Sequence, residues 1–182
     1  MIPFSELSHP QTTVAVMKTS ELLIDAHGRI KEVLHHVVEG LDDKTLATRP
    51  GDTANSIAWL VWHLTRVQDD HLADAGGYEQ VHTADGWHER LGLPLSAGDT
   101  GYAHSPEQVA LVQLSAEQLL GYYDAVHART VEFLKTVTDE GLDRIVDRRW
   151  TPPVTLGVRL VSVIDDCAQH AGQAAYVKGL LS

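Results

Sequence analysis

Apolar residues recur at spacings of three and four along four long stretches of this 182-residue chain. Such spacing follows the 3.6-residue turn of an α-helix and gathers the apolar side chains on one face. In the first stretch, about residues 20–41, that face carries Leu23, His27, Ile30, Leu34 and Val38. No alternating pattern is long enough to require a β-sheet. The chain must therefore bury four helical stripes against one another.

Residues that start and stop helices support the other three stretches, which cover about residues 55–74, 115–137 and 155 or 156 to 181. Asn55 and Ser56 offer side chains that can cap a helix N-terminus, and Gly76 and Gly77 can end that helix. The sequence SAEQ, which begins at Ser115, is typical of a capping box. Each long stretch is thus expected to be a separate helix.

Two long connections join these helices. Residues 78–106 are rich in Gly, Asp, His and Thr, and a short helix is expected over residues 106–112. The second connection includes Pro152 and Pro153 before the last helix begins. Four helices with two long crossings predict an all-α fold, a four-helix bundle with long crossover connections. Since no linker or low-complexity tract interrupts the chain, residues 1–182 are expected to form a single domain.

Composition excludes several classes of partner. The net charge is −11 and the basic residues are scattered, so no nucleic-acid partner is expected. No stretch approaches ~20 uninterrupted apolar residues, so no membrane span is expected. Residues 1–16 lack the basic start and apolar core of a signal peptide. Cys167 is the single cysteine, which prevents an intrachain disulfide and favours a reducing, cytoplasmic location.

The last predicted helix contains an acid and a histidine one turn apart. Asp166 and His170 are four residues apart, so their side chains lie on the same helix face. A carboxylate and an imidazole at this spacing can hold one metal ion, but they can also form a simple hydrogen-bonded pair. Asp165 is rotated ~100° from Asp166 and is expected to face solvent.

His63 lies in the middle of the apolar face of the second predicted helix. A single histidine there can equally be a core residue satisfied by a neighbour. If the second and fourth helices pack together, His63, Asp166 and His170 could supply three metal ligands and leave a position open for water. His71 shares the His63 face but lies ~12 Å further along the axis, too far to bind the same ion.

Other polar and aromatic residues allow weaker assignments. His27, Trp59 and Tyr123 could line a substrate pocket, although core packing explains them at least as well. Cys167 lies in an acidic, apolar setting that should raise its pKa, which argues against a nucleophilic role. No catalytic residue can be named from the sequence.

The segments SIAWLVWHLTRVQDDHL and DDCAQHAGQ resemble two helices of the DinB-like (YfiT-type) superfamily of metal-binding four-helix bundles. The resemblance extends over nearly the whole chain in order and spacing. It makes His63 and His170 the counterparts of two family metal ligands. The family position that most often holds a third histidine is Asp166 here. A carboxylate at that place is similar to the mycothiol-dependent maleylpyruvate isomerase branch.

The resemblance implies a divalent-metal-dependent enzyme that uses a low-molecular-weight thiol of the mycothiol type, either as an S-transferase or as an isomerase. Zn, Ni or Fe, held by His63, Asp166 and His170, would activate the thiol to attack a small electrophile. A homodimer is expected by family analogy. Three alternatives remain: a non-catalytic, stress-related bundle that binds metal or ligand; a metal-dependent hydrolase or Fe(II) oxygen-activating enzyme; and a bundle without metal.

Overall fold

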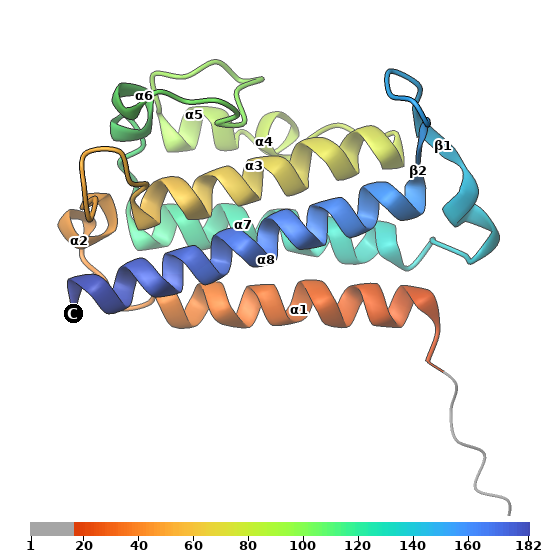
Figure 1. The fold of residues 1–182 in the computed structure, drawn as a ribbon, viewed down its shortest axis with the longest axis horizontal. Coiled ribbons are helices and arrows are strands. Elements are labelled where there is room, and N and C mark those ends of the chain that lie inside the picture. Colours follow the sequence, from red (N-terminus) through yellow and green to blue (C-terminus); the bar gives the residue numbers. More distant parts are fainter. Residues whose placement is uncertain (1–16) are drawn as a thin grey trace, which may run out of the picture.

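The computed structural model describes residues 17–182, and most of this segment is helical. The four long helices are α1 (Thr19–Val38), α3 (Ile57–Gly76), α7 (Ala116–Leu134) and α8 (Leu156–Leu181). They lie side by side as a bundle (Figure 1). The predicted all-α bundle is therefore confirmed. The expectation that residues 1–16 carry no signal peptide concerns residues outside those described.

The caps predicted from the sequence are present. Ser56 accepts a hydrogen bond from the Trp59 backbone N–H at the start of α3, and Gly77 ends that helix with φ +70°. Ser115 and Gln118 form the capping box of α7. Helix α8 begins after Thr155, whose side chain accepts from the Val158 N–H. Local sequence therefore sets where the bundle helices begin and end.

The connections contain short elements. Helix α2 (Asp43–Ala47) follows α1, and the long crossing from α3 to α7 carries α4 (Val81–Ala84), α5 (Trp87–Leu91) and α6 (Pro106–Ala110). The predicted short helix near residue 106 is α6. The second connection holds a 3-10 helix, η1 (Glu140–Asp143), and an antiparallel hairpin of β1 (Ile145–Asp147) and β2 (Val154–Thr155). The sequence did not indicate this hairpin because strands of three and two residues are too short for an alternating pattern.

Helix α3 is buried on nearly every side. Helices α7 and α8 pack against it within the bundle, and the long crossing lies over its outer face (Figure 1). Polar residues of α3 are therefore buried with the apolar ones, among them Arg66, Gln68 and Asp69. Each must find partners inside the protein, because an unpaired buried polar group is costly. Within residues 17–182, no helix combines the length and apolar character that a membrane crossing requires.

Packing of α8 against the bundle gives a direct stability test. Leu160 is 1% exposed, whereas the adjacent Val161 is 64% exposed. We expect Leu160→Ala to lower the free energy of unfolding by about 2–5 kcal/mol, because it leaves a cavity in the core. Val161→Ala should change it by about 0.5 kcal/mol or less. Urea denaturation of both variants measures the difference, and equal effects would contradict this packing.

Candidate metal centre

Two neighbouring helices bring three possible metal ligands together. His63 comes from α3, and Asp166 and His170 come from α8. One ligand atom from each side chain lies within 4.8 Å of the other two. In the described part of the chain, no other group of three histidine, cysteine or acidic side chains converges in this way. The structure thus places side by side the three residues that the sequence analysis selected as candidate ligands.

Hydrogen bonds engage the Nδ1 atom of each imidazole ring. The Nδ1 of His63 bonds to the carbonyl oxygen of Thr100, and the Nδ1 of His170 lies 2.8 Å from the Oε1 of Gln173. Because both partners are acceptors, each Nδ1 carries the proton and each Nε2 keeps a free lone pair. His170 Nε2 lies 3.7 Å from Asp166 Oδ1. The two rings therefore present the nitrogen that a metal ion requires.

Asp166 has an oxygen that the protein leaves unsatisfied. Its Oδ2 is buried and has no hydrogen-bond partner among the described residues. A buried carboxylate oxygen without a partner costs free energy, and a cation between the three side chains would remove that cost. Two histidines and a carboxylate suit Zn, Ni or Fe and leave coordination positions open. The residues present therefore fit a divalent metal ion.

Contacts around His63 fix its position. The Trp59 ring stacks on it, with centroids 4.6 Å apart and an interplanar angle of 12°. Trp59 Nε1 donates to His104 Nδ1 at 3.1 Å, so His104 must donate through Nε2 to Asp99, 3.0 Å away. Asp99 also accepts from the Gly101 N–H at 2.8 Å. Burial lowers the pKa of His63, which keeps the ring neutral and able to act as a ligand.

A buried arginine attaches the loop over His63 to α3. Arg66 is 0% exposed and donates through Nε to the carbonyl oxygen of Asp99 at 3.0 Å. Its Nη atoms donate to Tyr122 Oη at 3.1 Å and to Gln80 Oε1 at 2.8 Å. Tyr122 in turn donates to Asp69, which lies 3.5 Å from Arg66. Sequence reasoning missed Arg66, because nothing in the local pattern shows that its partners come from the distant crossing.

The three predicted pocket residues have different surroundings. Trp59 lies beside the candidate ligands, since it stacks on His63 and meets His170 edge-on at 6.3 Å. His27 and Tyr123 are 0% exposed and lie in the bundle interior. Both ring nitrogens of His27 and the hydroxyl of Tyr123 lack partners among the described residues. The structure therefore places these two residues in the core and not on an open wall.

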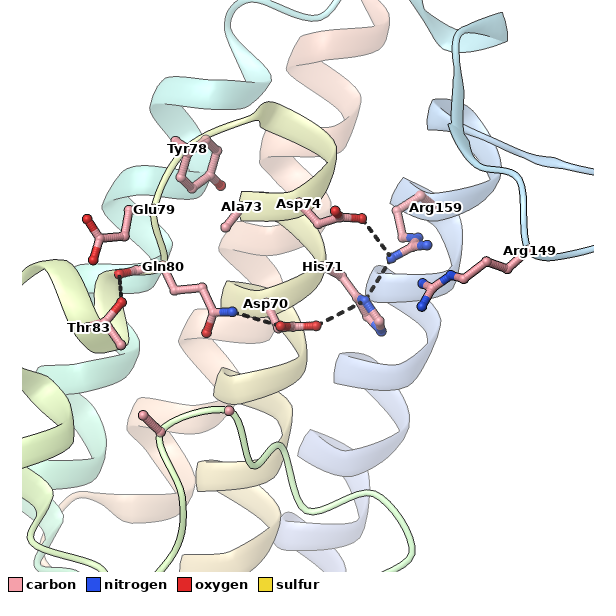
Figure 2. A pocket seen from close by; sticks show the side chains of 12 residues that line it. Asp70, His71, Ala73, Asp74, Tyr78, Glu79, Gln80, Thr83, Arg149 and Arg159 are labelled. Atoms are coloured by element: carbon pink, nitrogen blue, oxygen red, sulfur yellow. Dashed lines mark hydrogen bonds and ion pairs between the residues drawn. The ribbon is translucent and has the colours of Figure 1, made fainter.

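A solvent-accessible cleft begins at Asp166. It consists of three adjoining hollows of about 300, 350 and 600 Å³, and His71 and Arg159 line all three. The smallest reaches Asp166, and Figure 2 shows the largest. Arg159 Nη1 donates to His71 Nδ1 at 2.7 Å. We name this feature the His71–Arg159 cleft. His71 is excluded from the metal by its distance from His63 along α3, yet it lines the adjacent cleft.

Comparison with family models identifies one family. The model of the DinB superfamily matches residues 28–174. A crystal structure described as the conserved protein of locus from Enterococcus faecalis is similar, with 31% sequence identity and a TM-score of 0.85. The similarity covers 91% of this chain and 98% of that one. Among curated proteins, none matches the chain.

Gly101 offers a test of how the loop orients His63. Its φ is +89°, and an added Cβ would lie 2.8 Å from His63 Nδ1. Gly101→Ala should therefore displace the loop or the ring and weaken Zn²⁺ binding about tenfold or more. Gly98→Ala is the matched control, because a Cβ there meets nothing within 4 Å. Competition with a chromogenic chelator measures both affinities, and unchanged affinity in Gly101→Ala would refute this role.

His27 provides a test by pH. Burial lowers its pKa to about 4 from the ordinary 6.5, so the unfolded chain binds a proton in this range that the native protein does not. Stability should therefore fall as pH decreases from 6.5 toward 4. His27→Leu should reduce the slope of the free energy of unfolding against pH by up to about 1.4 kcal/mol per pH unit. Denaturation at several pH values measures this slope, with His36→Leu at an exposed position as the control. Parallel profiles for His27→Leu and wild type would contradict the lowered pKa of His27.

Proposed function

The chain belongs to the DinB superfamily, and we propose that it is a divalent-metal-dependent enzyme whose ion is held by His63, Asp166 and His170. One observation carries this proposal. One ligand atom of each of His63, Asp166 and His170 lies within 4.8 Å of the other two, beside an accessible hollow, and Asp166 Oδ2 has no hydrogen-bond partner among the described residues. Three protein ligands with open positions form the arrangement of catalytic metal sites, whereas structural sites are closed by a fourth ligand.

We propose thiol transfer to a small electrophile as the reaction, or an isomerisation that proceeds through such an addition. The chain supplies no cysteine nucleophile at the site, because Cys167 is 0% exposed and burial raises the pKa of its thiol. The nucleophile must then come from solution. A bound divalent ion would favour the thiolate form of a low-molecular-weight thiol. The carboxylate at position 166 supports the mycothiol-type branch through the sequence resemblance described above.

The surrounding residues would prepare the site in three ways. Trp59 and the loop at Thr100 and Gly101 cover His63, which is 7% exposed, and exclude water from that side. Gln173 fixes the His170 ring from the exposed side of α8. The hollow next to Asp166 leaves one direction of approach open for small molecules. Substrates would therefore reach the site from the side of the His71–Arg159 cleft.

Metal content of the purified protein is the first test. We expect close to one divalent ion per chain in wild type and at least a tenfold loss in the double variant Asp166→Ala, His170→Ala. Asp165→Ala is the control, since Asp165 is exposed and bonds only to Gln169 in the described structure. Elemental analysis gives the metal and its amount. Equal, negligible metal in all three proteins would overturn the proposal.

Turnover is tested on the metal-loaded protein with a panel of low-molecular-weight thiols and a chromogenic electrophile. His63→Ala should abolish turnover and leave the helical circular dichroism unchanged. Metal without any thiol turnover would support a non-catalytic binding protein instead. Hydrolysis of ester substrates without thiol would favour the hydrolase alternative.

A further inference from the structure

We infer that the His71–Arg159 cleft binds the carboxylate group of a small molecule whose apolar part lies toward Asp166. The inference rests on the proposed function where it treats that molecule as the electrophilic substrate. Binding itself depends only on residues of the cleft and needs no metal. The hydrogen-bond donors of a nearly buried arginine and the apolar lining of the cleft support it.

Arg149 and Arg159 both contact Asp147, the buried acid of the cleft, which is also lined by Asp70, Asp74, Glu79 and Asp166. Arg149 binds Asp147 through two parallel contacts, Nε to Oδ1 at 3.0 Å and Nη2 to Oδ2 at 2.8 Å. These contacts hold the pKa of Asp147 well below its usual range. Arg159 reaches the same carboxylate at 3.3 Å. Two guanidinium groups thus share one carboxylate.

Two further acids, Asp74 and Asp70, lie near the Arg159–His71 pair. Asp74 Oδ2 lies 4.0 Å from Arg159 Nη1, and its side chain is 59% exposed, so solvent screens the pair. Asp70 accepts from Gln80 at 2.7 Å, and its Oδ2 lies 3.6 Å from His71 Nδ1. The Arg159 side chain is only 9% exposed, so its charge is partly desolvated. An anion entering the cleft would therefore gain more from Arg159 than from an exposed arginine.

Free donors point into this space. The Arg159 guanidinium has five N–H groups, of which one donates to His71 and one to Asp147. Its other N–H groups have no hydrogen-bond partner within residues 17–182, although Asp74 Oδ2 forms an ion pair with Nη1 at 4.0 Å. Because a guanidinium only donates, His71 Nδ1 must accept, and the ring proton lies on Nε2. No described residue accepts from that Nε2. Figure 2 shows Arg159 and Arg149 approaching His71 from α8 and from the hairpin.

Apolar side chains form the other part of the site. Val67, Val154 and Val158 line the hollow of about 300 Å³ together with Trp150. Trp150 is 65% exposed, so core packing does not explain its place on the hairpin. Asp166 lies at the same hollow and Arg159 bounds it. The site therefore suits a small ligand with a flat or apolar body and one carboxylate, which Arg159 and His71 would bind.

Benzoate and its neutral analogue benzamide test this inference in metal-free protein. Trp150 is the exposed one of the four tryptophans, so fluorescence should report the cleft, and Trp150→Phe should remove the signal. We expect saturable binding of benzoate with a Kd at least tenfold below that of benzamide. Equal binding of the two, or no saturation by benzoate up to about 50 mM, would overturn the inference. This comparison needs no variant in Arg159.

Two variants locate the carboxylate. Arg159→Gln should weaken the binding of benzoate at least tenfold and leave the binding of benzamide unchanged. Arg148→Gln removes the same charge from an exposed neighbour of the cleft and should leave both affinities unchanged. His63→Ala should retain benzoate binding although it loses metal. Loss of benzoate binding in His63→Ala would place the carboxylate at the metal ligands and overturn the inference, whereas failure of metal binding alone would overturn only the proposed function.

Discussion

The buried guanidinium of Arg66 determines how the long crossing lies over α3. A fully buried charge is tolerated only when an opposite charge and hydrogen-bond acceptors surround it. Arg66 obtains them from Asp69 one turn away, from Tyr122 on α7, and from carbonyl oxygens of Asp99 and Ala97 in the crossing. Because Arg66 is three residues after His63, the loop that satisfies it also reaches His63. The orientation of a candidate ligand thus follows from the burial of a neighbouring charge.

The two sides of the candidate centre are built differently. His63 is enclosed by Trp59 and by the loop at Gly101, so the α3 side is closely packed. The α8 side is more open: the side chains of Asp166 and His170 are 34% and 19% exposed. The hollow that reaches Asp166 lies between α3, the hairpin and α8, and Arg159 lines it. Rigid support on one face and access on the other are both needed for chemistry at a metal site.

The sequence predicted what depends on local periodicity. Apolar spacing and capping residues gave the four long helices, and the spacing of Asp166 and His170 placed both on one face of α8. The structure then brought His63 next to them because α3 and α8 pack together. Features that depend on distant partners were not predictable. His71 pairs with Arg159, 88 residues later, and the hairpin that carries Trp150 is too short for a periodic signal. The full burial of His27 also arises from packing, since its helix position alone fits a pocket wall equally well.

The aspartate at position 166 and Arg159 place opposite charges at the same hollow of the cleft. Asp166 places a negative charge at the candidate metal ligands, while Arg159 places a positive charge at the other end of the same hollow. With a divalent ion bound, this carboxylate leaves the site one positive charge lower than a third histidine would. A carboxylate-bearing molecule would then be attracted less strongly to the ion and would compete less with a thiol for the open positions. Arg159 and His71 would hold the carboxylate away from those positions, and the apolar body would lie between them. Under the proposed function, Asp166 and the charged cleft would thus be two parts of one arrangement, in which each substrate would have its own binding site.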